Sequence, residues 1–212
     1  MNLADIRTAY GRGKLSRADL HPDPIEQFNR WLKDACDAAL VEPTSMSLAT
    51  VGADARPLLR TVLLKGLDAR GFVFFSNLES RKARQLAENP NAALLFPWLA
   101  LERQVAVTGP VEKLSSAESL KYFLTRPRDS QLAAWASRQS TVVASRKMLE
   151  MEWAQMKAKF SAGQVPLPSF WGGYRVKPET IEFWQGRQSR LHDRFQYTLQ
   201  PDASWRIDRL AP

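Results

Sequence analysis

Apolar side chains recur every three or four positions along several stretches of the chain, which is the spacing of an amphipathic helix. The clearest stretch is 24–40, where Ile25 and Phe28 begin one apolar face. Asp23 and Pro24 precede that face as a capping residue and a proline at the first helical position, an arrangement typical of helix starts. The same spacing predicts four further helices, over residues 80–89, 116–126, 129–136 and 142–160.

Between these stretches lie short runs rich in β-branched and aromatic residues, which favour strands. The runs are residues 45–51, 58–65, 72–76, 92–98, 103–114, 170–176, 181–185, 190–197 and 205–210. Turn residues at 52–54 and 68–71 separate the first three runs, which therefore predict an antiparallel meander. Strands in both halves of the chain, with helices between them, predict one α+β domain built on an antiparallel barrel or sheet.

The composition is that of an ordinary globular protein. Hydrophobic residues make up 44% and charged residues 25% of the 212 residues, enough to bury a core without a disulfide or a structural metal. One cysteine, Cys36, and two histidines cannot build a zinc cage, so we expect no metal. The longest apolar run, 92–101, is too short to cross a membrane, and the N-terminus lacks the apolar stretch of a secretory signal. These features predict a soluble, cytoplasmic protein that does not bind membranes.

The net charge of +8 raises the question of an anionic partner. Nucleic acid would favour clustered cations, whereas acidic residues separate most basic groups here and no zinc-finger or RNA-binding motif is present. Scattered charge usually forms only a solvated surface. A small anionic ligand needs only a few well-placed cations. The composition does not decide between nucleic acid, a solvated surface and a small anion, so the local motifs must.

Two motifs place cations where a phosphate could bind. Arg60 and Lys65 flank an apolar strand, but alternation puts them on opposite faces, so a shared site requires a bulge or a strand that ends before Lys65. Ser80, Arg81 and Lys82 stand at a helix start, where free N–H groups and two cations can hold a phosphate. In an arbitrary protein, both motifs would more commonly be the exposed ends of a strand or a helix.

Tyr122, Arg126 and Ser130 are spaced four apart, so they offer a phenol, a guanidinium and a hydroxyl on one side of a helix. Pro127 interrupts that helix, and the stripe must continue across a kink. A break lined with donors can bind an anion, although such residues also occur in exposed turns. No glycine-rich nucleotide-binding motif and no nucleophile elbow is present.

A strand near the C-terminus would place Arg190, His192 and Arg194 side by side on one face. Three cationic or titratable groups in a row repel one another unless an anion lies against them. On the preceding strand Glu182 and Trp184 share one face, and Trp184 either packs in the core or forms a wall for a flat aromatic ligand.

Nine segments occur in the order and wording of one family: RTVLLK (60–65), FFSNLESRKA (74–83), LLFPWLALERQV (94–105), KYFLTRPRDSQ (121–131), SRQS (137–140), PLPSFWGGYRV (166–176), IEFWQG (181–186), RLHDRF (190–195) and IDRLAP (207–212). Through them the chain resembles the pyridoxamine 5′-phosphate oxidase family. The resemblance implies an FMN-binding split barrel, an antiparallel Greek-key β-barrel with surrounding helices. It also implies a homodimer with one FMN at each end of the interface, and a single domain over 21–212 after an N-terminal segment, 1–20.

The activity that the resemblance implies is FMN-dependent oxidation of pyridoxamine 5′-phosphate and pyridoxine 5′-phosphate to pyridoxal 5′-phosphate. The flavin accepts a hydride from the substrate and dioxygen reoxidises it, giving hydrogen peroxide, with ammonia released from the amine. The alternatives are a split-barrel flavoprotein reductase, a flavin or haem carrier on the same barrel and, more remotely, a basic nucleic-acid binder.

The resemblance also assigns site residues position by position. The FMN contacts would be Arg60, Thr61, Val62, Leu63, Leu64, Lys65, Phe75, Ser76, Arg81, Lys82, Gln104, Gln139, Ser140, Trp184 and Arg194. A second subunit would supply four of these, namely Gln139, Ser140, Trp184 and Arg194. Phe75 stands where a tyrosine is common in the family.

The substrate residues follow in the same way. Those expected at the substrate phosphate are Lys65, Tyr122, Arg126 and Ser130. Arg190 and His192 would face the pyridine ring as the catalytic residues, with Leu191 between them also at the substrate, and Arg7 and Tyr10 belong to the N-terminal segment that folds over the substrate.

Overall fold

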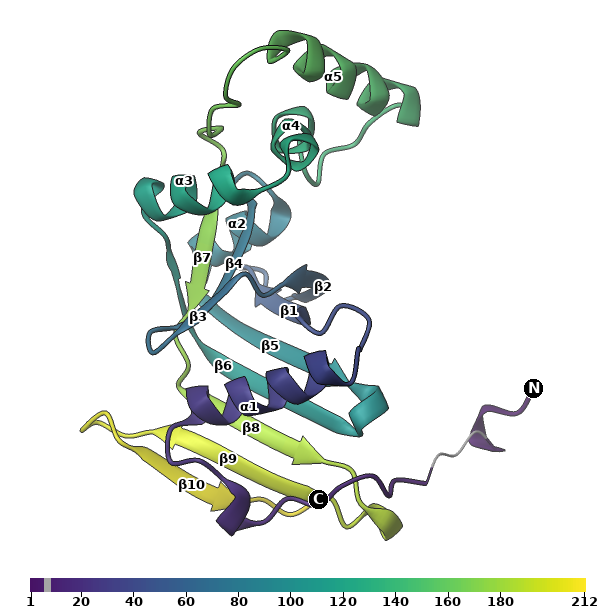
Figure 1. The fold of residues 1–212 in the computed structure, drawn as a ribbon, viewed down its shortest axis with the longest axis vertical. Helices are drawn as coiled ribbons and strands as arrows, with labels where there is room; N and C mark the ends of the chain where they lie inside the picture. The colour runs from purple at the N-terminus through teal and green to yellow at the C-terminus, as the bar shows by residue number, and fades with distance from the viewer. Residues whose placement is uncertain (6–8) are drawn as a thin grey trace.

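A computed structural model describes residues 1–5 and 9–212 as an α+β structure around an antiparallel sheet (Figure 1). The strands are β1 (Ser45–Val51), β2 (Pro57–Leu63), β3 (Gly66–Asp68), β4 (Gly71–Asn77), β5 (Asn91–Trp98), β6 (Arg103–Lys113), β7 (Trp171–Val176), β8 (Thr180–Gln185), β9 (Asp193–Leu199) and β10 (Trp205–Arg209). The helices are α1 (Pro24–Asp37), α2 (Arg81–Glu88), α3 (Ser116–Thr125), α4 (Arg128–Ala136) and α5 (Arg146–Lys159).

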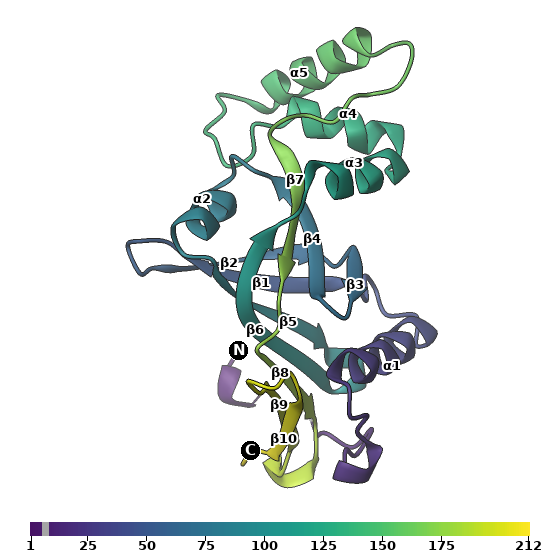
Figure 2. The ribbon, with the colours of Figure 1, turned by 90° about the vertical axis from the view of Figure 1, so that its left-hand side faces the viewer.

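The sheet has two sections that share the long strand β6. One section runs in the order β10-β9-β8-β6-β5-β1-β2, and β7 pairs with the far end of β6 and with β4, which also pairs with β3. At the junction, a Cβ atom on Gly109 would lie 1.9 Å from the carbonyl oxygen of Lys177, so only glycine allows the two backbones to approach. The sheet therefore changes partners along β6, and β4 and β7 extend from it toward α3 and α4 (Figures 1 and 2).

The main core lies between α1 and one face of the first section. Phe28 of α1 is fully buried, with its ring centroid 5.0 Å from that of Phe72 and 4.7 Å from that of Phe96. Alternation along the strands sends every second side chain to this face: Phe183 and Phe195 lie opposite each other across β8 and β9, and both are buried. The intervening side chains, such as Trp184, point to the other face and are only half-buried.

A second, smaller core holds the helices at the other end of the molecule. Its buried members come from α3, α4, β7 and the loop before β7: Phe123, Leu132, Ala134, Val165 and Trp171. Figure 2 shows α3, α4 and α5 gathered at this end, with β8, β9 and β10 at the opposite end. Among the described residues, no helix has both the length and the apolar character that crossing a membrane requires.

The predicted helices are confirmed, with shifted boundaries. α1 ends at Asp37 because Ala39 takes a left-handed φ of 51°. α5 begins at Arg146 rather than at residue 142, and the Ser145 hydroxyl accepts a hydrogen bond from the Met148 amide as its cap.

Two strand predictions were wrong in part. β1 and β2 form the predicted hairpin, but β4 pairs with β3 and β7, so the meander does not continue. The strand predicted over 190–197 begins only at Asp193, because Ser189 and Arg190 have φ values of 57° and 60° that turn the chain.

Replacing Phe28 with alanine should remove the ring that joins α1 to both sheet sections. We expect the free energy of unfolding to fall by about 3–5 kcal/mol, the usual cost of truncating a buried phenylalanine. Denaturant unfolding of both proteins at the same protein concentration measures this change in the free energy of unfolding. Val41→Ala is the control: Val41 is 94% exposed, and its substitution should change stability by less than about 0.5 kcal/mol. A Phe28→Ala effect no larger than the control's would contradict this account of the core.

Candidate functional site

A cavity of about 800 Å³ opens between β2, β4 and the helices α2, α3 and α4. Its volume is in the range of small-molecule and cofactor sites. The lining residues are Leu58, Leu59, Arg60, Thr61, Val62, Leu63, Lys65, Phe75, Ser76, Asn77, Arg81, Lys82, Tyr122, Arg126, Ala133, Ala134, Ser137, Gln139, Ser140 and Trp171.

Positive charge dominates this cavity. Its lining contains the cations Arg60, Lys65, Arg81, Lys82 and Arg126 and no aspartate or glutamate. Cations held together without counter-charges repel one another, and the repulsion is relieved when an anion binds between them. The cavity is therefore suited to an anionic ligand.

Lys82, in the first turn of α2, is the most enclosed of these cations. Its residue is only 7% exposed, and its Nζ donates to Ser76 Oγ (2.9 Å), Ser80 Oγ (3.3 Å) and Gln139 Oε1 (2.7 Å). Burial, and secondarily the charge of Arg60, lowers the pKa of Lys82 to about 8. All three partners are neutral, so a negatively charged ligand would be a stronger partner than any of them.

Arg60 lies beside this group on β2. Its Nη1 donates to the Thr50 hydroxyl (2.6 Å) and the Leu48 carbonyl (3.1 Å), and no carboxylate pairs with it in the described structure. Burial, and then the charge of Arg81, lowers the pKa of Arg60. β2 ends at Leu63, which meets the condition under which Arg60 and Lys65 can share a site, and both line the cavity.

Stacked aromatic rings form one wall of the cavity. The Phe75 ring lies 4.0 Å from Tyr122 with 15° between the planes, and 5.2 Å from Trp171 with 7° between them. Burial raises the pKa of Tyr122, which keeps its hydroxyl protonated and able to donate. Such a wall suits a flat ring system, and the Phe75 side chain takes part through its face without needing a hydroxyl.

Arg126 caps α3 at its C-terminal end, with its guanidinium 4.8 Å from the centre of the Trp171 ring. Its Nη1 is buried and has no hydrogen-bond partner among the described residues. Burial lowers the pKa of Arg126, and a buried N–H group without an acceptor is costly. A ligand oxygen at this point would satisfy it.

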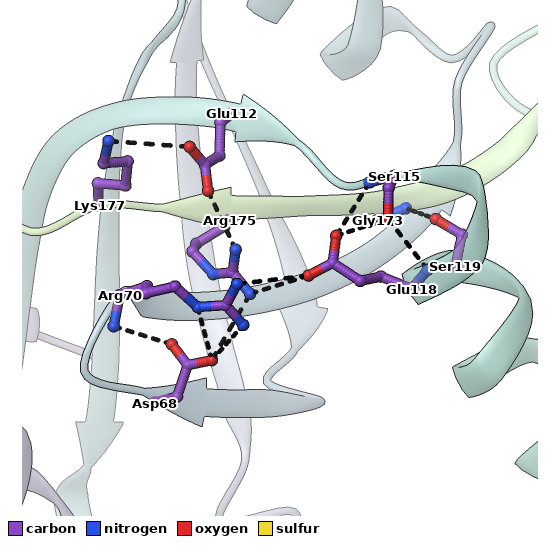
Figure 3. A network of polar contacts seen from close by, with 9 residues as sticks. All are labelled: Asp68, Arg70, Glu112, Ser115, Glu118, Ser119, Gly173, Arg175 and Lys177. Atoms are coloured by element: carbon purple, nitrogen blue, oxygen red, sulfur yellow. Dashed lines mark hydrogen bonds and ion pairs between the residues drawn. The ribbon is translucent and has the colours of Figure 1, made fainter.

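A network of charged residues fixes the start of α3 (Figure 3). Tyr122 and Arg126 follow on the same helix and at its C-terminal cap. The Glu118 carboxylate accepts from the Ser115 amide and hydroxyl, whose bonds hold the pKa of Glu118 below its usual range, and it pairs with Arg175 at 3.6 Å. The other members balance this charge: Asp68, Arg70, Glu112 and Lys177. One step further along α3, the Ser119 hydroxyl accepts from the Gly173 amide at 3.2 Å. The helix is thus tied to β7 at its N-terminal end, before its cavity residues Tyr122 and Arg126.

A second group of predicted residues lies on the outer face of the sheet. Gln104, Trp184 and Arg194 lie directly opposite one another across β6, β8 and β9, so their side chains share that face. Arg194 makes a two-pronged ion pair with Glu182, at 2.7 and 3.1 Å, which raises the pKa of Arg194. None of the three lines the cationic cavity.

His192 joins this second group just before β9. Its ring centroid lies 4.6 Å from that of Trp184 and 5.4 Å from that of Tyr10. The Arg187 amide donates to His192 Nδ1 at 3.1 Å, so the neutral imidazole carries its proton on Nε2. The interpretation of Arg190, His192 and Arg194 as one strand face was wrong, because Arg190 lies in a 3₁₀ turn, Gln188–Arg190, and β9 begins after His192.

The structure thus divides the predicted site residues into two sets. In the cavity are Arg60, Thr61, Val62, Leu63, Lys65, Phe75, Ser76, Arg81, Lys82, Tyr122, Arg126, Gln139 and Ser140. At the β8–β9 end are Tyr10, Gln104, Trp184, Arg190, Leu191, His192 and Arg194. Of the remaining three, Leu64 is buried in the core, Ser130 does not line the cavity and Arg7 lies outside the described residues.

One subunit assignment is corrected. Gln139 and Ser140 were expected from a second subunit, yet Gln139 bonds Lys82 and the Arg81 amide donates to the Ser140 hydroxyl within one chain. The segment after α4 returns over the start of α2, which brings these residues to the cations of their own chain.

Sequence reasoning missed seven lining residues. They are Leu58, Leu59, Asn77, Ala133, Ala134, Ser137 and Trp171. Trp171 stands inside a segment already recognised as FWGGYRV, so it could have been found. Asn77 and Ser137 also stand inside recognised segments, 74–83 and 137–140. What the sequence did not show is the long-range bond that joins them, from the Asn77 side-chain amide to the Ser137 carbonyl at 3.2 Å.

Comparisons with known sequences agree along the whole chain. The family described as pyridoxamine 5′-phosphate oxidase matches residues 32–160, and a pyridoxine 5′-phosphate oxidase C-terminal dimerisation region matches residues 171–212. The pyridoxine/pyridoxamine 5′-phosphate oxidase of Rippkaea orientalis is 58% identical over 212 residues, and that of Hahella chejuensis is 60% identical over 213 residues. Each alignment covers 100% of both chains.

Solved structures confirm the predicted fold class. PhzG from Burkholderia lata, crystallised with tetrahydrophenazine-1-carboxylic acid, has a TM-score of 0.88 and 30% identity, covering 95% of this chain and 100% of that one. A pyridoxamine 5′-phosphate oxidase-related, FMN-binding protein from Nostoc punctiforme shares the fold with a TM-score of 0.73 and 15% identity, covering 91% of this chain and 100% of that one.

The charge state of Lys82 should control how the cavity binds anions. With a pKa of about 8, Lys82 is protonated below that pH and neutral above it, so inorganic phosphate should bind progressively more weakly as the pH rises through 8. Calorimetric titration of phosphate between pH 7.5 and 9.5, on protein stripped of small molecules, measures this.

Lys82→Met should bind phosphate weakly throughout and lose this pH dependence. Lys147→Met, at an exposed position on α5, is the charge-matched control and should behave as the unmodified protein. A phosphate affinity that stays constant from pH 7.5 to 9.5 would remove Lys82 from the anion site.

Proposed function

The chain belongs to the pyridoxamine 5′-phosphate oxidase family, and we propose that its two residue sets come together, across a homodimer, into one active site. The enzyme oxidises pyridoxine 5′-phosphate and pyridoxamine 5′-phosphate to pyridoxal 5′-phosphate, with FMN as its cofactor. The observation that carries the site assignment is a cavity lined by cations and aromatic rings and by no carboxylate. Such a cavity can take two phosphate esters and two flat rings.

The cations form two clusters, one for each phosphate. Arg60, Arg81 and Lys82 meet at the start of α2, where hydroxyl and amide groups already surround the lysine, and this donor set fits the FMN phosphate. Lys65 and Arg126 also line the cavity, and we assign them to the second phosphate. When bound, FMN would supply the redox chemistry, as hydride acceptor for the substrate and electron donor to dioxygen, with hydrogen peroxide as the second product.

The second cluster would hold the substrate phosphate. The unpartnered Nη1 of Arg126, the protonated hydroxyl of Tyr122 and the ammonium of Lys65 supply donors that a phosphate dianion accepts. Ser130 remains a prediction here, since it lies on the first turn of α4 but outside the cavity lining. The clamp fixes the phosphate end of the substrate and thereby limits how its ring can lie.

The partner subunit would complete each cavity. Gln104, Trp184 and Arg194 lie on the outer sheet face, and two of them fall in the region that matches a dimerisation region, residues 171–212. In a two-fold symmetric dimer the same surfaces meet twice, so one chain's outer face can close the other's cavity and the reverse. This division gives Gln139 and Ser140 to the cavity's own chain and adds Gln104 to the partner's contribution.

Arg190 and His192 would act on the substrate ring from the partner subunit. With Nδ1 occupied by the Arg187 amide, neutral His192 presents Nε2–H and so donates a hydrogen bond to a ring oxygen, rather than accepting a proton there. The Arg190 guanidinium, exposed in a single chain, can orient the ring from the turn that precedes His192. Tyr10 packs beside them and would exclude water from the same side.

The other split-barrel functions lack support from this cavity. A flavin reductase or a flavin carrier needs the Lys82 cluster but has no use for a second cationic cluster with an unpartnered buried N–H. We also propose a cytoplasmic location, since a chain with one cysteine builds none of the intrachain disulfides that are common in extracellular proteins.

Substituting Arg126 with alanine should impair recognition of the substrate phosphate while FMN stays bound. We expect KM for pyridoxine 5′-phosphate to rise at least about tenfold, because a charge-assisted contact to the dianion is lost. Steady-state peroxide release and the flavin absorbance of purified protein measure both properties. Arg146→Ala, at an exposed ion pair on α5, is the control. Equal use of phosphorylated and unphosphorylated pyridoxine by the unmodified enzyme would refute the clamp.

A mixed dimer tests whether the two residue sets meet across subunits. Arg126→Ala and Arg190→Ala homodimers should each lose about 10²-fold or more in kcat/KM. A heterodimer of the two variants, purified through two different tags, has one site with both arginines and one with neither. It should therefore recover about half the activity of the unmodified dimer. Activity as low as that of the two homodimers would place both arginines in the same chain's site.

A further inference from the structure

Residues 10–15 lie against the β8–β9 end through backbone hydrogen bonds. Gly11 and Arg12 both donate their amides to Glu102 Oε2 at 2.8 Å, and the Leu15 amide donates to Asp193 at 3.1 Å. Arg187 Nη1 donates to the Gly13 carbonyl at 3.0 Å. Of these hydrogen bonds, the two that lie nearest to Tyr10 along the chain are both accepted by the same carboxylate oxygen of Glu102.

Glu102 is held in a defined position. It follows the 3₁₀ turn Leu99–Leu101 with a left-handed φ of 54°, a conformation that a non-glycine residue adopts at an energetic cost. Its carbonyl accepts from the Gly186 amide at 2.7 Å and from Gln185 Nε2 at 3.1 Å. The carboxylate is therefore tied to the end of β8, the strand that carries Trp184.

The Tyr10 ring packs against the backbone of Gly186, beside Glu102. A Cβ on Gly186 would lie 2.6 Å from Tyr10 Cδ1 and 3.1 Å from Glu102 Cβ, so the ring occupies the space that the glycine leaves. From there the Tyr10 ring reaches Trp184 at 5.7 Å and His192 at 5.4 Å, edge to face in both cases.

We propose that Glu102 is a positioning residue for the oxidase reaction. Its carboxylate binds the amides of Gly11 and Arg12 and so sets the register in which Tyr10 packs against Trp184 and His192. The inference rests on the proposed function, which places Tyr10 and His192 at the substrate and Trp184 in the same completed site. Glu102 touches neither the cationic cavity nor the reacting ring, and it acts only through the segment that it holds.

Glu102→Ala in the FMN-loaded enzyme tests this role. Losing two charge-assisted hydrogen bonds should lower kcat/KM for pyridoxine 5′-phosphate about tenfold through KM, with kcat changed less than about twofold and flavin content unaltered. Trypsin should cut after Arg12 at least about tenfold faster, because the segment is released. Glu102→Gln keeps an acceptor oxygen, so its kcat/KM and its cleavage rate should lie between those of the unmodified enzyme and those of Glu102→Ala.

Glu88→Ala is the matched control. Glu88 also accepts a backbone amide, that of Ala53 at 2.9 Å, but in a loop that does not contact residues 10–15, so KM and cleavage after Arg12 should stay as in the unmodified enzyme. The Tyr10→Ala background shows whether Glu102 acts through Tyr10: there Glu102→Ala should cause little further loss of kcat/KM.

The inference fails if Glu102→Ala leaves KM unchanged even though cleavage accelerates. It fails as well if Glu102→Ala lowers kcat/KM by the same factor in the Tyr10→Ala background as in the unmodified enzyme. It also fails if cleavage after Arg12 does not accelerate. Failure of the proposed function would instead be visible in the unmodified enzyme, as absence of bound flavin or of phosphate-dependent peroxide release.

Discussion

Uncompensated positive charge around one cavity is the constraint on which the rest of this structure depends. The other buried cation among the described residues, Arg175, is neutralised: Asp68, Glu112 and Glu118 surround it. In the cavity no acid is supplied, and burial of Lys82 among neutral partners lowers its pKa to about 8. This arrangement destabilises the empty cavity and favours phosphate, so the same charges that oppose folding supply the affinity for cofactor and substrate.

The balanced network and the charged cavity lie at the two ends of one helix, α3. α3 starts at the Ser115 cap, is tied to β7 through Glu118 and Arg175, and ends at Arg126, whose guanidinium enters the cavity. Ion pairs that balance each other's charge fix the start of the helix. The unpartnered Arg126 guanidinium at its other end therefore has a defined position. Preorganisation of this kind lowers the cost of ordering the clamp when substrate binds.

In the proposed active site, the path of β6 explains why one chain does not supply every residue. At Gly109 the strand exchanges its pairing with β8 for pairing with β7. This change sends α3 and α4 to one end of the molecule and β8, the strand that carries Trp184, to the other (Figure 2). On the proposed assignment, each chain would carry the phosphate-binding half of one site and the ring-facing half of another. Dimerisation would then be part of the chemistry.

Local signals in the sequence determined the helix starts, the faces of the strands and the positions of several cations in this protein. The Ser115 capping box, the alternation along β8 and the cations at the start of α2 are all set by groups within four residues of one another, and the structure has each of them where the sequence predicts it. Only the tertiary structure decided which distant segments meet. The left-handed turn at Ser189 and Arg190 ends the predicted strand face, and the return of Gln139 to Lys82 places it in its own chain's cavity. Both depend on contacts between residues far apart in the chain, whose free energy no local pattern of side chains contains.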